Sequence, residues 1–75
     1  MNVDLTKKFE AFLNDAGIES GGCAVYQDKE GRYYLVTRIT VSNGDLYLIN
    51  SGFIYDYPEI WENTGPWKLL YTKPN

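Results

Sequence analysis

The order of apolar and polar residues predicts one amphipathic helix at the start of the chain. Its apolar residues recur every three or four positions, the spacing that places side chains on one side of a helix: Leu5, Phe9, Phe12, Leu13 and Ala16. Either Asn2 or Asp4 can cap the start, and Gly17 stands at the left-handed position that ends many helices. We therefore predict a helix from Val3 to Ala16.

Two hairpins that share a central strand, residues 32–41, are predicted after Ser20-Gly21-Gly22. The first turns at Lys29-Glu30-Gly31, which predicts the cross-strand pairs Gln27 with Tyr33, Val25 with Leu35, and Cys23 with Thr37. The second turns at Asn43-Gly44, which predicts the pairs Val41 with Leu46, Ile39 with Leu48, and Thr37 with Asn50.

Both registers agree on which residues share a face of this sheet. One face is predicted to lie under the helix and holds Cys23, Val25, Tyr33, Leu35, Thr37, Ile39, Val41, Leu46 and Leu48. The opposite face holds Ala24, Tyr26, Tyr34, Val36, Arg38, Thr40, Tyr47 and Ile49. The outer face of an antiparallel sheet is usually polar, but this one is aromatic and aliphatic with Arg38 as its only charge. We expect a cover for it: the segment 53–71 of the same chain, another protein or a second copy, or a small ligand between the rings.

The remainder of the chain is less regular. Residues 53–57 are predicted to extend the third strand until Pro58 ends it, and residues 59–66 read as a loop with one helical turn. A last strand is predicted from Trp67 to Thr72. The expected fold is therefore a single α+β domain over residues 1–75. In it, one N-terminal helix packs on an antiparallel meander of three to five strands, which is either open or closing toward a barrel.

Composition excludes several classes of function but does not identify the function. The chain has 75 residues, ten acidic against seven basic, for a formal net charge of −3. The length leaves room for one thin core, and the acidic balance argues against binding to a nucleic-acid backbone. There is no histidine and one cysteine, Cys23, so neither a disulfide framework nor a Cys/His zinc site is expected within the chain. A lone thiol and the lack of a signal peptide or membrane-length apolar run indicate a cytoplasmic protein.

Candidate catalytic groups are weak. Cys23 has no histidine to activate it, and the acids Asp56, Glu59 and Glu62 follow no diagnostic spacing. We interpret these acidic residues as part of a solvated loop, or as the border of a surface that contacts a basic partner. We expect no catalytic residue, no metal site and no cofactor.

Aromatic residues are the strongest functional signal, because twelve of the 75 are Tyr, Phe or Trp. The predicted binding residues are those of the second sheet face and of the Tyr- and Trp-rich loop: Tyr26, Tyr34, Arg38, Tyr47, Ile49, Tyr55, Tyr57 and Trp61. The resulting hypothesis is a non-enzymatic protein-binding module, of the inhibitor or adaptor kind that phages and mobile elements encode, docking another protein or a second copy. The alternative is an oligomer that binds a planar or nucleotide-like ligand, with Arg38 facing its phosphate or carboxylate.

Overall fold

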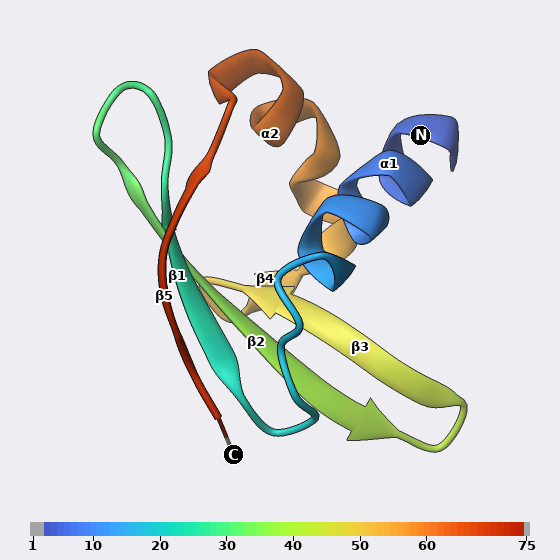
Figure 1. Cartoon of the computed structure of the whole chain (residues 1–75). Helices are drawn as coiled ribbons and strands as arrows, with labels where there is room; N and C mark the ends of the chain where they lie inside the picture. The colour runs from blue at the N-terminus through green and yellow to red at the C-terminus, as the bar shows by residue number, and fades with distance from the viewer. Residues whose placement is uncertain (1–2, 75) are drawn as a thin grey trace.

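The computed structural model describes residues 3–74 and has two layers, with the helices on one face of a five-stranded antiparallel sheet (Figure 1). Along the chain the elements are α1 (Val3–Asn14), β1 (Cys23–Gln27), β2 (Tyr33–Val41), β3 (Gly44–Ile49), β4 (Gly52–Phe53), the 3₁₀ turn η1 (Ile54–Asp56), α2 (Pro58–Thr64) and β5 (Lys68–Lys73). The strand order is β4-β3-β2-β1-β5, so the last strand returns to pair with the first. The predicted α+β class is confirmed, and the sheet stays open instead of closing into a barrel.

Helix α1 forms where its apolar stripe predicts it and ends two residues early. Phe9 and Leu13 are fully buried by it. The last turn tightens, because the amides of Ala16 and Gly17 donate to Leu13 and Asn14, three residues back. Gly17 then takes the expected left-handed conformation, with φ of +68°.

The register of the first hairpin is confirmed and that of the second is wrong by two residues. In the second, the two turn residues are Ser42 and Asn43, so the pairs are Val41 with Gly44, Ile39 with Leu46, and Thr37 with Leu48. This register brings Asp45 to within 2.6 Å of the Arg38 guanidinium. A shift of two residues keeps every side chain on its predicted face, because side chains alternate with a period of two.

The prediction of which face the helix covers is wrong. Helix α1 lies on the face that was expected to point away from it, and the buried residues of that face are Ala24, Tyr26, Tyr34, Val36, Tyr47 and Ile49. The Phe12 ring lies 5.2 Å from the Tyr26 ring, and the Tyr47 hydroxyl donates to Asn14 of α1 at 2.6 Å. The large rings of this face interleave with those of the helix, and their polar ends find partners there.

The segment between β3 and β5 adds a second cover to the same face. Asn50 and Ser51 turn the chain with positive φ, so β4 folds back on β3 and residues 53–57 do not prolong that strand. Pro58 begins α2, which is two turns long where one was predicted. Trp67 then stacks on Tyr34 with ring centroids 3.9 Å apart. Of the three covers expected for this face, the structure contains the one formed by the same chain, and helix α1 is part of that cover.

Candidate functional site

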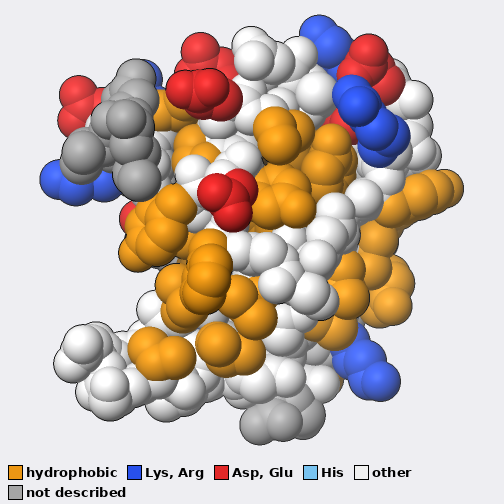
Figure 2. Space-filling view, turned by 180° about the vertical axis from the view of Figure 1, so that it is seen from behind, with side chains coloured by type: hydrophobic (Ala, Val, Ile, Leu, Met, Phe, Trp, Pro, Cys, Tyr) orange, Lys and Arg blue, Asp and Glu red, His pale blue; other side chains and the backbone are white. Residues whose placement is uncertain are grey.

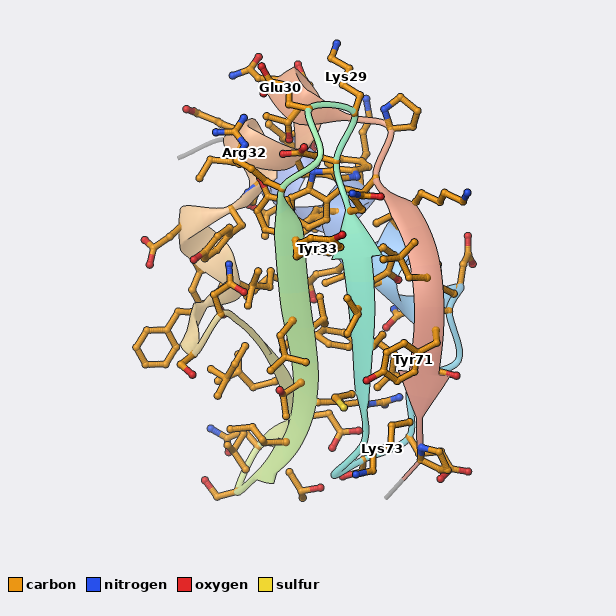
Figure 3. All side chains as sticks on the ribbon, turned by 90° about the vertical axis from the view of Figure 1, so that its left-hand side faces the viewer. Lys29, Glu30, Arg32, Tyr33, Tyr71 and Lys73 are labelled. Atoms are coloured by element: carbon orange, nitrogen blue, oxygen red, sulfur yellow. The ribbon has the colours of Figure 1, made fainter. Side chains whose placement is uncertain are left out.

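The opposite side of the sheet has no element lying over it within residues 3–74. We call it the open face, and by register its side chains are those of Cys23, Val25, Gln27, Tyr33, Leu35, Thr37, Ile39, Val41, Leu46, Leu48, Phe53, Lys68, Tyr71 and Lys73. Its most exposed large side chains are Tyr33 at 64%, Phe53 at 59% and Tyr71 at 57% of their full area. In Figure 3 the sheet is seen from this side, with Tyr33 and Tyr71 in front of the strands and the helices behind. Figure 2 shows the molecule from behind, a quarter turn away from the view of Figure 3, and hydrophobic side chains are exposed on that surface too.

Charge is distributed unevenly between this face and the remainder of the chain. None of the ten acidic residues occupies an open-face position, although the chain as a whole is acidic. The only charged residues of the face are Lys68 and Lys73, at the two ends of β5. The open face is therefore apolar and aromatic, with a positive margin along one edge.

That margin is also the long edge of the sheet. Strand β5 pairs with β1 on one side, and no strand within residues 3–74 pairs with its other side. All six residues from Lys68 to Lys73 are exposed. The opposite edge, β4, is only two residues long. Strand β5 thus presents a row of backbone donors and acceptors beside the open face.

Four of the eight predicted binding residues lie in the core instead of on a surface. Tyr26, Tyr34, Tyr47 and Ile49 are each at most 6% exposed. The Arg38 guanidinium donates to Asp45 at 2.6 Å and to the backbone carbonyl of Ile18 at 2.8 Å. Arg38 therefore joins β3 and the segment after α1 to β2, and its side chain is committed to contacts within the chain.

The three aromatic residues predicted from the loop have different surroundings. Tyr55 is exposed in η1, on the helical side of the sheet. The Tyr57 ring meets Tyr34 edge to face, with centroids 6.5 Å apart. Trp61 lies half-buried in α2, and its ring is 5.3 Å from that of Phe12. The structure does not bring these three together with the predicted sheet residues into one surface.

Trp61 does line a cleft between α1 and α2. The cleft has a volume of about 340 Å³ and is lined by Leu5, Lys8, Phe12, Trp61, Glu62, Gly65 and Pro66. This volume is within the range of small-molecule sites. Its wall is apolar apart from Lys8 and Glu62, and neither of these makes an ion pair within the described part of the chain.

Asp28 is a buried acid that is not among the residues predicted from the sequence. Its carboxylate accepts hydrogen bonds from the Tyr34 hydroxyl at 2.7 Å, from Arg32 Nε at 3.1 Å, and from the backbone amides of Glu30 and Arg32. Burial alone would raise the pKa of Asp28, but these hydrogen bonds and the Arg32 charge outweigh it and hold the pKa below its usual value. The sequence does contain a signal for this role. An aspartate at the start of a tight turn commonly accepts a hydrogen bond from the amide two residues later. With its oxygens occupied, Asp28 stabilises the β1–β2 turn.

Other kinds of site have little support in the described residues. Cys23 is half-buried on the open face, and within residues 3–74 no three Cys, Asp or Glu side chains gather as metal ligands. No helix in this range is long and apolar enough to cross a membrane. No family model matches the chain, and no curated protein and no solved structure matches it either.

Proposed function

We propose that the protein is a non-enzymatic binding module, an inhibitor or adaptor, that docks a partner protein on its open face. The observation that carries the proposal is the uncovered aromatic and aliphatic surface of Tyr33, Leu35, Phe53 and Tyr71. Exposed apolar surface of this extent is typical of interaction sites. The face differs from the one expected from sequence, but the type of interaction is the same.

The charges of this surface define the chemistry of the partner. Because the open face holds Lys68 and Lys73 and no acid, it complements an apolar surface bordered by carboxylates. A second copy of this chain would bring two positive margins and no acid to such a contact. We therefore propose a different protein with an acidic border as the partner.

The side chains that could take part in catalysis are few, which supports a non-enzymatic role. The most buried carboxylate, Asp28, already accepts hydrogen bonds on both of its oxygens. Cys23 has no histidine in the chain to activate it. The cytoplasm remains the proposed location, because this thiol has no second cysteine with which to pair.

The proposed contact is tested by capture with two variants of the protein. Replacing Tyr33 and Phe53 together by Ser removes the two largest exposed rings of the open face. The matched control is Ile60→Ser, which removes an exposed apolar side chain of α2, on the helical side. With immobilised protein and a lysate of the producing organism, we expect specific proteins bound by the wild type and by Ile60→Ser to be lost from the double variant. Capture of the same proteins by all three forms would contradict the proposal, and so would no capture by the wild type.

A second candidate function is suggested by the cleft between α1 and α2. Its apolar wall with Trp61 and the cation of Lys8 at its margin suit a planar ring that carries a carboxylate. Indole-3-acetate is a suitable probe, and its binding is followed by NMR titration of the protein. We expect saturable binding that Lys8→Glu weakens at least tenfold and Lys7→Glu, its exposed neighbour on α1, leaves unchanged. No binding at millimolar probe, or an equal response of both variants, would exclude this role.

A further inference from the structure

We infer that the free edge of β5 binds an extended acidic segment of the partner, which adds a sixth strand to the sheet. This inference rests on the proposed function, because it names the part of the partner that the module recognises. Strand addition at an exposed edge obtains affinity from main-chain hydrogen bonds and specificity from alternate side chains.

The edge of β5 adjoins the open face directly. By register, Lys68, Tyr71 and Lys73 of β5 belong to the open face. A segment paired along the other side of β5 would therefore continue this surface, and its backbone hydrogen bonds would add a second contact to docking on the face.

Strand β5 has the geometry that such pairing needs. Its six residues are all exposed, and only its β1 side is paired within the described residues. A bulge near Leu70 lets six residues of β5 span the five of β1, so that Lys68 pairs with Gln27 and Lys73 with Cys23. Both lysines thus stand on the open face at the two ends of the edge, where Figure 3 shows Lys73 beside Tyr71.

The same lysines decide which strand can be added. In-register antiparallel pairing of two β5 strands would place Lys68 of each copy opposite Lys73 of the other, and directly opposed like charges destabilise a pair of strands. A strand with acidic residues at these positions makes two favourable pairs instead. The net charge of −3 disfavours a nucleic acid as the occupant.

A pair of short peptides tests the inference directly. The probe is a fluorescein-labelled peptide of sequence Glu-Val-Thr-Val-Glu, whose glutamates have the four-residue separation of Gln27 and Cys23 on β1. The reversed-charge control is Lys-Val-Thr-Val-Lys. By fluorescence anisotropy we expect the wild type to bind the acidic peptide at least tenfold more tightly. The double variant Lys68→Glu with Lys73→Glu should reverse this preference, and both substitutions are at exposed positions, so the fold is retained.

N-methylated peptides separate strand addition from simple charge attraction. Two forms of the acidic peptide carry N-methyl groups on alternate amides, each blocking one edge of the peptide strand. Only one of its edges can pair with β5, so we expect one form to lose binding at least tenfold and the other to retain it. Equal binding of both forms would contradict strand addition.

Several results would overturn the inference while leaving the proposed function standing. These are failure of the acidic peptide to bind at millimolar concentration, equal binding of both peptides, or binding of a labelled oligothymidine that the lysine substitutions abolish. A wild-type dimer that Lys68→Glu with Lys73→Glu abolishes, measured by light scattering, would assign the edge to a second copy. In each case, capture that still depends on Tyr33 and Phe53 would show that the open face acts without the edge.

Discussion

The two faces of the sheet are both apolar, yet only one of them is covered. On the covered face, the aromatic rings have polar ends that are satisfied inside the chain: Tyr34 donates to Asp28 at 2.7 Å and Tyr47 to Asn14 at 2.6 Å. On the open face, Tyr33 and Tyr71 keep more than half of their surface in contact with solvent. The rings of the covered face thus pack against α1 and Trp67, and two of their hydroxyl groups have partners there, whereas the rings of the open face are exposed to solvent.

This difference has a consequence for function. Covered aromatic residues stabilise the fold, whereas exposed ones on a flat sheet are available to another molecule. If the comparison is right, similar substitutions on the two faces should have unequal effects on stability and on binding.

The largest difference is expected between two phenylalanines. Phe9 is fully buried, and its ring lies 5.2 Å from Trp61 and 5.4 Å from Trp67. Phe9→Ala should cost about 3–5 kcal/mol of unfolding free energy, because it leaves a cavity in a small core. Phe53→Ala on the open face should cost less than about 0.5 kcal/mol. Urea unfolding followed by circular dichroism measures both, and equal losses would contradict the assignment of the faces.

A second difference is expected at alkaline pH. Burial, with the nearby charges of Tyr47 and Asp15, raises the pKa of Tyr26 to about 12. Between the ordinary tyrosine pKa of about 10 and this value, the unfolded chain loses the proton and the folded chain keeps it. Stability should therefore be complete below pH 10 and fall by up to about 3 kcal/mol toward pH 12, at about 1.4 kcal/mol per pH unit. Tyr26→Phe should lessen this fall, and urea midpoints from pH 8 to 12 measure it.

At acid pH the β1–β2 turn should respond in the opposite sense. Because the folded pKa of Asp28 lies below its usual value, the stability from this carboxylate is present above about pH 4 and is lost as pH falls through the folded pKa. Asp28→Asn should be less stable near neutrality and should show a shallower loss on acidification. Thermal unfolding between pH 2 and 7 tests this, and a pH profile identical to that of the wild type would contradict it.

The smallest effect is expected for one hydroxyl group. Tyr47→Phe removes the hydrogen bond to Asn14 and keeps the ring in the core, so it should cost about 1 kcal/mol. Tyr33→Phe on the open face is the control, with an expected change close to zero. An equal loss at both positions in urea unfolding would mean that Tyr33 also has a structural partner.

Sequence periodicity was sufficient for α1, for β1, β2, β3 and β5, and for the residues of the first three strands that share each face, but not for β4, η1 and the length of α2. The glycine that ends α1 and the turn of the first hairpin are local signals, and both are confirmed: Gly17 and Gly31 have positive φ. The second turn was placed one residue late, because Asn43-Gly44 is the stronger local signal, whereas Ser42 and Asn43 form the turn.

Periodicity alone does not predict which face of the sheet the helix covers, because both faces are apolar. The choice depends on contacts between distant residues, such as Trp67 stacked on Tyr34 and Asn14 bonded to Tyr47. For the same reason, Tyr26 and Arg38 read as surface binding groups although they hold the fold together. The sequence does not indicate the length of α2, because proline is typical both of the end of a strand and of the first residue of a helix, and Pro58 is the latter.

The most direct measurement is the solvent exposure of each tyrosine in the isolated protein. The chain is labelled with 3-fluorotyrosine, each ¹⁹F signal is assigned by a Tyr→Phe substitution, and a soluble gadolinium chelate is added. We predict strong broadening of Tyr33 and Tyr71 and little broadening of Tyr26 and Tyr34 in dilute solution. Protection of Tyr33 and Tyr71, or broadening of Tyr26 and Tyr34, would show that the sheet does not present an uncovered aromatic face for docking.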